Sequence, residues 1–288
     1  MIHPYKPFIG IFAGDPGAGK TFSVLSFPDP ILILDLENRA EWNLFYWGFK
    51  EVEIRSVLEM AEKSVKLGSR TIMAGMPHPL KTLHRLEREI AKVVSEMKEG
   101  KWATVVIDSI SDIRDWAAIE AEAKGIALWN PKTGPVGWRY PNERTREILF
   151  PLIHTSRKLA KEGKYVNVIF TVWLKDEYDE SGKRIGKTLD TKEFVLYNVD
   201  WVIWMERREE TVKKYMEEGG VKKMVTVNEP RYYARCDIPG KTKGMFTGWV
   251  LDVTDTGFWK PFIEFCDKKL EELRKKIEKI KAVYGGAR

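Results

Sequence analysis

The chain has 288 residues, of which 43% are hydrophobic and 31% are charged, values typical of one large α/β domain with an appended element. No run of about 18 uncharged apolar residues occurs, and no signal-peptide pattern precedes the first apolar segment, so we expect a cytoplasmic protein without a membrane segment. The net charge of +6, with 48 basic and 42 acidic residues interleaved, permits an anionic partner such as nucleic acid but does not require one.

The cysteines and histidines give no sign of a disulfide framework or a metal centre. Cys236 and Cys266 lie far apart and lack C-x-x-C spacing, and the four histidines show no spacing typical of metal ligands. The sequence contains no glutamine while lysine and glutamate are abundant, a composition associated with proteins from hot habitats. We therefore expect a thermophilic source and assign no histidine to a metal.

The first predicted elements surround a glycine-rich loop. The apolar run 8–13 predicts a buried strand, and 21–27 predicts a short helix that ends before Pro28. Between them the letters GDPGAGKT match the pattern G-x-x-x-x-G-K-[ST] at every fixed position. In such a loop the backbone N–H groups face phosphate, the lysine reaches the terminal phosphates and the threonine hydroxyl ligates Mg²⁺. The predicted phosphate-binding residues are Gly14, Asp15, Pro16, Gly17, Ala18, Gly19, Lys20 and Thr21.

Three later strands are predicted to end in polar residues at one sheet edge. The run 31–34 leads to Glu37, the run 103–107 leads to Asp108, and the run 166–170 leads to Thr171. Because open α/β sheets bind ligands at the carboxyl ends of their strands, we expect Glu37 near the phosphates and Asp108 in the Mg²⁺ shell. Thr171 would sense the terminal phosphate. An exposed carboxylate in an ordinary turn stays open as the alternative for Glu37.

The helices of this region are predicted from spacing and breakers. Helical periodicity predicts helices over 80–99 and 110–124, and over 143–162 with a kink or a division at Pro151. A further helix is predicted over 56–67, with Ser56 as its N-cap.

Two segments after the predicted strands carry basic and aromatic residues. One is a long loop over 125–142, and the other is a turn-containing stretch over 173–190. Rings and cations interleaved in this way suit a single nucleic-acid strand, whereas a lid or interface loop and a solvated hairpin stay open as alternatives. The candidate DNA-binding residues are Trp129, Lys132, Trp138, Arg139, Lys175, Lys183 and Arg184.

The last part of the chain is predicted to contain antiparallel strands and one helix. A strand over 221–227 is expected to pair with 231–236 around an Asn-Glu-Pro turn. Arg231 and Arg235 are candidates for an arginine finger that reaches a neighbouring subunit, with ordinary surface charges as the alternative. The periodicity of 258–283 predicts a helix with a basic outer face. We therefore expect a core over 1–250 and a basic amphipathic helix over 251–288, packed on the core or extending from it.

The order of these motifs resembles the RecA-like ATPase core over roughly residues 7–240. More narrowly, the chain resembles phage- and archaeal-virus-associated ATP-binding proteins that consist of little beyond one RecA core, some of them single-strand annealing recombinases. The resemblance implies an α/β P-loop NTPase fold: a mainly parallel central sheet flanked by helices, antiparallel strands toward the C-terminal end and a terminal helix. It also implies DNA-binding loops at 125–142 and 174–190.

The resemblance implies ATP and Mg²⁺ as cofactors, with Lys20 and Glu37 as catalytic residues and Glu37 polarising the attacking water. The leading hypothesis is a Mg²⁺-dependent, DNA-stimulated ATPase that acts as a homo-oligomer on single-stranded DNA in recombination, annealing or replication. The alternatives are a P-loop kinase of small molecules and a nucleotide-switched scaffold in virion assembly or DNA packaging.

Overall fold

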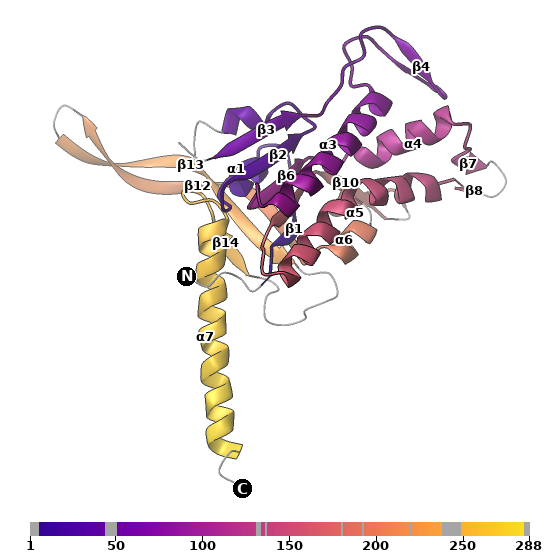
Figure 1. The fold of residues 1–288 in the computed structure, drawn as a ribbon. Coiled ribbons are helices and arrows are strands. Elements are labelled where there is room, and N and C mark those ends of the chain that lie inside the picture. The colour runs from indigo at the N-terminus through magenta and orange to yellow at the C-terminus, as the bar shows by residue number, and fades with distance from the viewer. Residues whose placement is uncertain are drawn as a thin grey trace.

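The computed structural model describes residues 6–43, 51–130, 134–135, 137–179, 181–191, 193–218, 221–237 and 249–284. Its centre is an eight-stranded sheet in the order β14-β13-β12-β1-β9-β6-β2-β3 (Figure 1). The strands are β1 (Ile9–Ala13), β2 (Ile31–Asp35), β3 (Val52–Ser56), β6 (Thr104–Asp108), β9 (Asn167–Val172), β12 (Trp201–Glu218), β13 (Val221–Asp237) and β14 (Val250–Asp252). Strands β3, β2, β6, β9, β1 and β12 are mutually parallel, whereas β13 and β14 are antiparallel to their neighbours.

The central strands consist of short apolar runs that are buried on both faces. Every residue of β1, β2, β6 and β9 is buried, as expected for parallel strands covered by helices on each side. The strands β9, β6, β2 and β3 lie on one side of β1, whereas β12, β13 and β14 lie on its other side. The order of the strands therefore reverses direction at β1. Ligands of open α/β sheets bind in the crevice that such a reversal creates.

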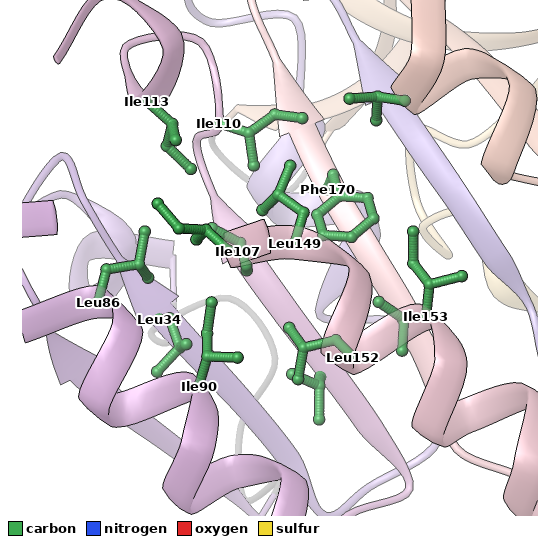
Figure 2. Packing of buried hydrophobic residues seen from close by; sticks show 14 of the residues in the cluster. Leu34, Leu86, Ile90, Ile107, Ile110, Ile113, Leu149, Leu152, Ile153 and Phe170 are labelled. Atoms are coloured by element: carbon green, nitrogen blue, oxygen red, sulfur yellow. The ribbon is translucent and has the colours of Figure 1, made fainter. Parts of the chain in front are cut away.

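The helices cover both faces of the sheet. They are α1 (Lys20–Val24), the 3-10 helix η1 (Ala40–Asn43), α3 (Pro79–Glu99), α4 (Ile113–Ala123), α5 (Arg139–Lys161), α6 (Glu193–Asn198) and α7 (Trp259–Tyr284). On one face, side chains of α3 and α5 pack over strand residues such as Leu34, Ile107 and Phe170 (Figure 2). On the other face, aromatic rings from β1 and from the start of the α7 region meet, and the rings of Phe12 and of Phe258, just before α7, lie 4.9 Å apart, edge to face. These layers confirm the predicted α/β fold class: a mainly parallel central sheet flanked by helices, with antiparallel strands toward the C-terminal end and a terminal helix.

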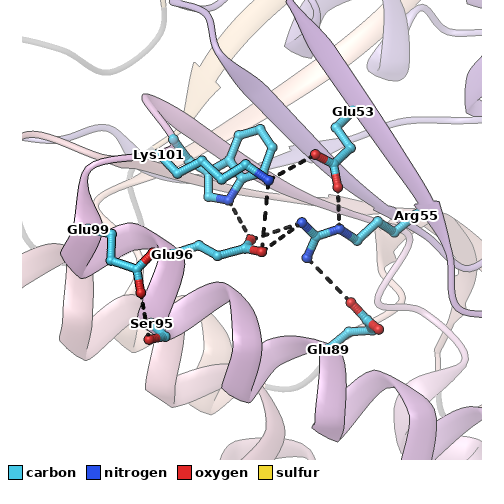
Figure 3. Close-up of polar contacts among 8 residues, drawn as sticks. Glu53, Arg55, Glu89, Ser95, Glu96, Glu99 and Lys101 are labelled. Atoms are coloured by element: carbon cyan, nitrogen blue, oxygen red, sulfur yellow. Dashed lines mark hydrogen bonds and ion pairs between the residues drawn. The ribbon is translucent and has the colours of Figure 1, made fainter.

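Helix α3 is joined to the edge strand β3 by a group of ionic contacts (Figure 3). The guanidinium of Arg55 on β3 donates to both carboxylate oxygens of Glu96 on α3, at 2.9 Å each. The same guanidinium contacts Glu53 and Glu89, and the indole N–H of Trp102 donates to Glu96 at 2.7 Å. The side chains of Arg55 and Glu96 are only 12% and 11% exposed, so these contacts fix the edge of the sheet against the helix layer.

Three predictions of local structure are wrong. Residues 56–67 do not form a helix, because Ser56 is the last residue of β3 and the following chain leads into the hairpin β4 (Val65–Leu67) and β5 (Arg70–Ile72). Helix α5 continues through Pro151, which is exposed, so the helix is not divided at this proline. The same helix begins at Arg139, which shortens the predicted loop over 125–142.

The third wrong prediction concerns the C-terminal hairpin. Residues 221–227 and 231–236 belong to one strand, β13, which pairs along its whole length with β12. Both strands run beyond the sheet as a long two-stranded arm, and α7 leaves the body in another direction (Figure 1).

Within the part of the chain that the structure describes, no helix is long and apolar enough to cross a membrane.

Candidate active site

The predicted phosphate-binding loop connects β1 to α1 at the carboxyl edge of the sheet. Gly17 and Gly19 have φ angles of 78° and 85°, which non-glycine residues adopt only with strain. A Cβ atom on Gly14 would lie 2.8 Å from the carbonyl oxygen of Met205 on β12. The backbone amide of Gly14 also donates to Val172 O at 3.2 Å. The glycines therefore let the loop turn tightly against β9 and β12.

Lys20 is held inside this loop. Its ammonium Nζ donates to Gly14 O at 2.8 Å and to Asp15 O at 3.1 Å, and the residue is 8% exposed. Burial lowers the pKa of Lys20, while the carboxylates of Asp108 and Glu37 oppose that shift. In this structure the ammonium is held by two carbonyl oxygens of the loop, and a bound phosphate would replace these contacts.

Asp108, at the end of β6, is the centre of a hydrogen-bond group beside the loop. The hydroxyl of Thr21 donates to Asp108 Oδ2 at 2.8 Å, and the hydroxyl of Thr171 on β9 donates to Asp108 Oδ1. Burial raises the pKa of Asp108, while these two hydrogen bonds act in the opposite direction. The structure thus brings together three of the residues that the sequence predicts for one sheet edge.

Glu37 lies in the loop that follows the neighbouring strand β2. Burial raises its pKa, and the negative charge of Asp108 adds to the shift, while a hydrogen bond with Ser109 lowers it in part. Its Oε1 atom is buried and has no hydrogen-bond partner among the described residues. A carboxylate with a raised pKa and one free acceptor atom is suited to receive a proton from a bound water.

Asp35 fixes the loop that carries Glu37, a role that the sequence analysis missed. Its Oδ1 accepts the backbone N–H of Glu37 at 2.8 Å, and its Oδ2 accepts those of Arg39 and Ala40 at 2.9 Å each. The backbone N–H of Leu36 donates to Asp108 O at 2.7 Å. The signal was present as an aspartate at the end of an apolar run, because such side chains commonly bond to backbone amides in the turn that follows.

The donor atoms at this corner fit a Mg²⁺ ion. The Thr21 hydroxyl and the Asp108 carboxylate offer hard oxygen atoms 2.8 Å apart. Mg²⁺ is commonly held by one or two protein oxygens, with phosphate oxygens and waters as its other ligands. Thr21 would therefore ligate the ion directly, and Asp108 would hold it through water.

The candidate DNA-binding residues between β7 and the first residue of α5 differ in exposure and in contacts. Trp129 is 64% exposed, on the short strand β7 (Trp129–Asn130), which pairs with β8 (Gly134–Pro135). Trp138 is half-buried, and its ring lies 4.2 Å below the guanidinium of Arg114. Arg139 forms an exposed ion pair with Glu143 at 2.7 Å. Lys132 lies outside the described residues.

The stretch over 173–190 forms the hairpin of β10 (Leu174–Tyr178) and β11 (Arg184–Leu189). Two of its candidate cations are ion-paired, Lys175 with Asp190 at 3.2 Å and Arg184 with Asp176 at 2.9 Å. Lys183 is exposed at the turn. A nucleic-acid phosphate would therefore compete with carboxylates for two of the three cations.

The two candidate arginine fingers differ in whether a carboxylate already neutralises them. Arg231 is paired with Asp252 on β14 at 2.9 Å. Arg235 lies over the ring of Trp204, 5.8 Å from its centroid, and no ion pair joins it to any described carboxylate. Both Arg235 and Trp204 line a cleft of about 270 Å³ between the start of the phosphate-binding loop and the base of the β12–β13 arm. Arg235 is thus the freer of the two guanidinium groups.

The chain is similar to one protein family over most of its length. A family model described as an AAA domain matches residues 6–236, a range that contains the phosphate-binding loop, Glu37, Asp108 and Thr171. Among solved structures, a KaiC-like protein from the hyperthermophilic archaeon Pyrococcus horikoshii OT3 shares 17% sequence identity, with a TM-score of 0.40. That similarity covers 87% of this chain and 88% of the other. No curated protein sequence matches the chain.

Proposed function

The chain belongs to the AAA domain family of ATPases, and from this premise we propose that it is a Mg²⁺-dependent ATP hydrolase that acts on single-stranded DNA as a homo-oligomer. One observation carries the hydrolase part of the proposal. Thr21 and Thr171 both donate to the buried carboxylate of Asp108, and Glu37 lies on the adjacent loop with a raised pKa. This arrangement provides a phosphate loop, a metal-binding corner and a base on one sheet edge.

Each residue has a distinct part in the proposed hydrolysis. Lys20 would leave the carbonyl oxygens of Gly14 and Asp15 and neutralise the terminal phosphates. Glu37 would accept a proton from the attacking water through Oε1, and its raised pKa brings its basicity closer to that required near neutral pH. Thr171 would hold Asp108 in position. Mg²⁺, when bound by Thr21 and Asp108, would neutralise negative charge on the phosphates.

The DNA part of the proposal is supported by two segments of the chain. The β10–β11 hairpin follows β9 directly and so starts at the sheet edge that carries the phosphate-binding loop, whereas the β7–β8 loop lies between α4 and α5. Trp129 is exposed and can stack on a base, and Lys183 is exposed at the hairpin turn. Arg139, Lys175 and Arg184 would have to exchange carboxylates for DNA phosphates.

The homo-oligomer part is supported by Arg235. Its guanidinium has no ion-pair partner among the described carboxylates and lines a cleft that the phosphate-binding loop also borders. A guanidinium in this position can stabilise phosphoryl-transfer charge, either in its own subunit or in a neighbour. Arg231 stays a weaker candidate because Asp252 already neutralises it.

The test is the rate of ATP hydrolysis with and without single-stranded DNA, with a mass measurement on the same sample. We expect DNA to raise the rate and the mass to exceed that of one chain. Stimulation should decrease when Lys183 and Arg184 are replaced together, and its salt dependence should become shallower. A rate that ignores DNA but requires a nucleoside or metabolite would indicate a small-molecule kinase. Retained biological activity in a non-hydrolysing Glu37→Gln variant would indicate a nucleotide-switched scaffold.

A further inference from the structure

The β10–β11 hairpin is attached to the phosphate-binding loop at two points. At its base, Val172 O accepts the backbone N–H of Gly14 at 3.2 Å, and the backbone N–H of Trp173 donates to Ser111 Oγ at 2.9 Å. Farther along, Lys187 Nζ of β11 contacts Asp15 Oδ2 of the loop at 2.5 Å. The base is therefore fixed by the sheet, and the second attachment depends on one ion pair.

Two carboxylates of the hairpin that could compete for Lys187 are already paired with other cations. Asp176 is the cross-strand neighbour of Lys187, but its carboxylate is paired with Arg184 at 2.9 Å. Asp190 is likewise paired with Lys175. The ammonium of Lys187 instead forms its ion pair with Asp15, a residue 172 positions earlier in the chain.

The contact between Lys187 and Asp15 contributes little to stability. The side chains are 36% and 50% exposed, and ion pairs this exposed to solvent stabilise a fold only weakly. The position of the pair is more informative than its strength. Asp15 places a negative charge on the loop that receives phosphate, and its carbonyl oxygen also accepts from Lys20. Phosphate binding would withdraw Lys20 from that carbonyl and add negative charge beside Lys187.

We propose that Lys187 is a positioning residue that transfers from Asp15 to the terminal phosphate when a nucleoside triphosphate binds. The position of the β10–β11 hairpin would therefore depend on which nucleotide is bound. This inference rests on the proposed ATP binding and is independent of the DNA proposal. A diphosphate lacks the terminal group, so with ADP the ammonium stays with Asp15. The hairpin would then have one position with ATP in the loop and another with ADP, and a ligand bound to its outer surface would distinguish the two states.

The test is hydrogen–deuterium exchange of the full chain, measured by mass spectrometry over 174–189. Samples contain Mg²⁺ with ADP or with a non-hydrolysable ATP analogue, and binding of each nucleotide is measured in parallel. In the wild type, we expect exchange in the hairpin to be several-fold slower with the ATP analogue than with ADP. Lys187→Met should remove this difference while the analogue still binds, and Lys187→Arg should restore it.

A matched control makes the result specific to the hairpin. Lys164→Met removes the same side chain and charge from an exposed position before β9 and should keep the wild-type difference. The inference is overturned if the analogue binds but hairpin exchange equals that with ADP, or if Lys187→Met keeps the difference. If the wild type binds neither nucleotide, the proposed function is overturned as well, so the two failures are distinguishable.

Discussion

At the scale of single residues, the site gathers two acidic groups whose surroundings disfavour the charged form. Burial raises the pKa of Asp108, and burial together with the charge of Asp108 raises that of Glu37. Lys20 is in the opposite position, because burial lowers its pKa. A Mg²⁺ ion and a nucleotide would supply the missing charges. Buried ionisable groups with shifted pKa values, such as these three, destabilise the protein without its ligands and are typical of catalytic sites.

The role of Glu37 as the base leads to a kinetic prediction. Glu37→Gln keeps the shape of the side chain but removes the group that accepts the proton. Because positioned bases contribute about 10²–10⁴-fold to rate, we expect ATP hydrolysis to fall by that factor while nucleotide binding persists. Phosphate release and nucleotide binding, measured on the same preparation, check this result. Hydrolysis at the wild-type rate would exclude Glu37 as the base.

The same residue carries a prediction for stability against pH. The pKa of Glu37 is raised above its ordinary value of 4.5, so the folded state holds the proton more tightly than the unfolded state. The protonated form therefore favours folding, and this contribution is lost as the pH rises through the folded pKa. We expect Glu37→Gln to increase the free energy of unfolding at pH 7 and to leave it nearly unchanged below pH 4.5. Denaturant titrations check this. An equal effect at both pH values would show that the charge of Glu37 is not involved.

At the scale of elements, the structure uses paired charges to attach helices to the sheet. Burial would raise the pKa of Glu96, but hydrogen bonds from Arg55 and Trp102 outweigh it and lower the pKa. A carboxylate with a lowered pKa contributes stability at neutral pH and loses that contribution as the pH falls through the folded pKa. The Arg55 group shown in Figure 3 is therefore expected to stabilise the edge strand at pH 7.

This expectation is tested by comparing two arginines. Arg55→Met leaves Glu96 buried without its guanidinium partner, and such losses cost about 3 kcal/mol. Arg139→Met makes the same change in a pair whose side chains are 86% and 54% exposed, and exposed pairs are worth about 0–1 kcal/mol. The free energies of unfolding of both variants, measured at pH 7, should differ accordingly. Similar losses in the two variants would mean that the network shown in Figure 3 does not stabilise the edge strand.

The strands and the loop that hold the candidate site residues are the parts of the fold that short sequence patterns could predict. The loop pattern spans eight residues, and Asp108 and Thr171 each end an apolar run, so their shared edge follows once the strands are parallel. The helix predicted over 56–67 was wrong because helix propensity is a weak prior, and Ser56 pairs within the parallel sheet instead. No local pattern encodes the contact between Lys187 and Asp15, since it joins residues 172 positions apart.

At the scale of the whole molecule, α7 begins as part of the core and then leaves the body (Figure 1). Phe258 and Phe262 are buried among Phe8, Phe12 and Phe27 from the start of the chain. The division between a core over 1–250 and a helix over 251–288 stays a prediction, and these rings indicate that the first turns of α7 help to hold the core.

The contribution of α7 can be measured by truncating one ring. Phe262→Ala removes a side chain that is 3% exposed, and such cavities cost about 3–5 kcal/mol. Ile185→Ala, at a position 59% exposed on the hairpin, should change stability by about 0.5 kcal/mol or less. Thermal or chemical denaturation of both variants checks the difference. If Phe262→Ala costs no more than the hairpin variant, α7 is an appendage and not a part of the core.

The claim on which the whole account depends is that the loop at Gly14–Thr21 binds ATP for Mg²⁺-dependent hydrolysis. The most direct measurement is phosphate release from ATP by the wild type and by Lys20→Ala, with and without Mg²⁺, alongside circular dichroism of both proteins. We expect steady release by the wild type that requires Mg²⁺, and a decrease of about 100-fold or more in a folded Lys20→Ala variant. Equal rates in the two proteins, or no release by the wild type, would contradict the account.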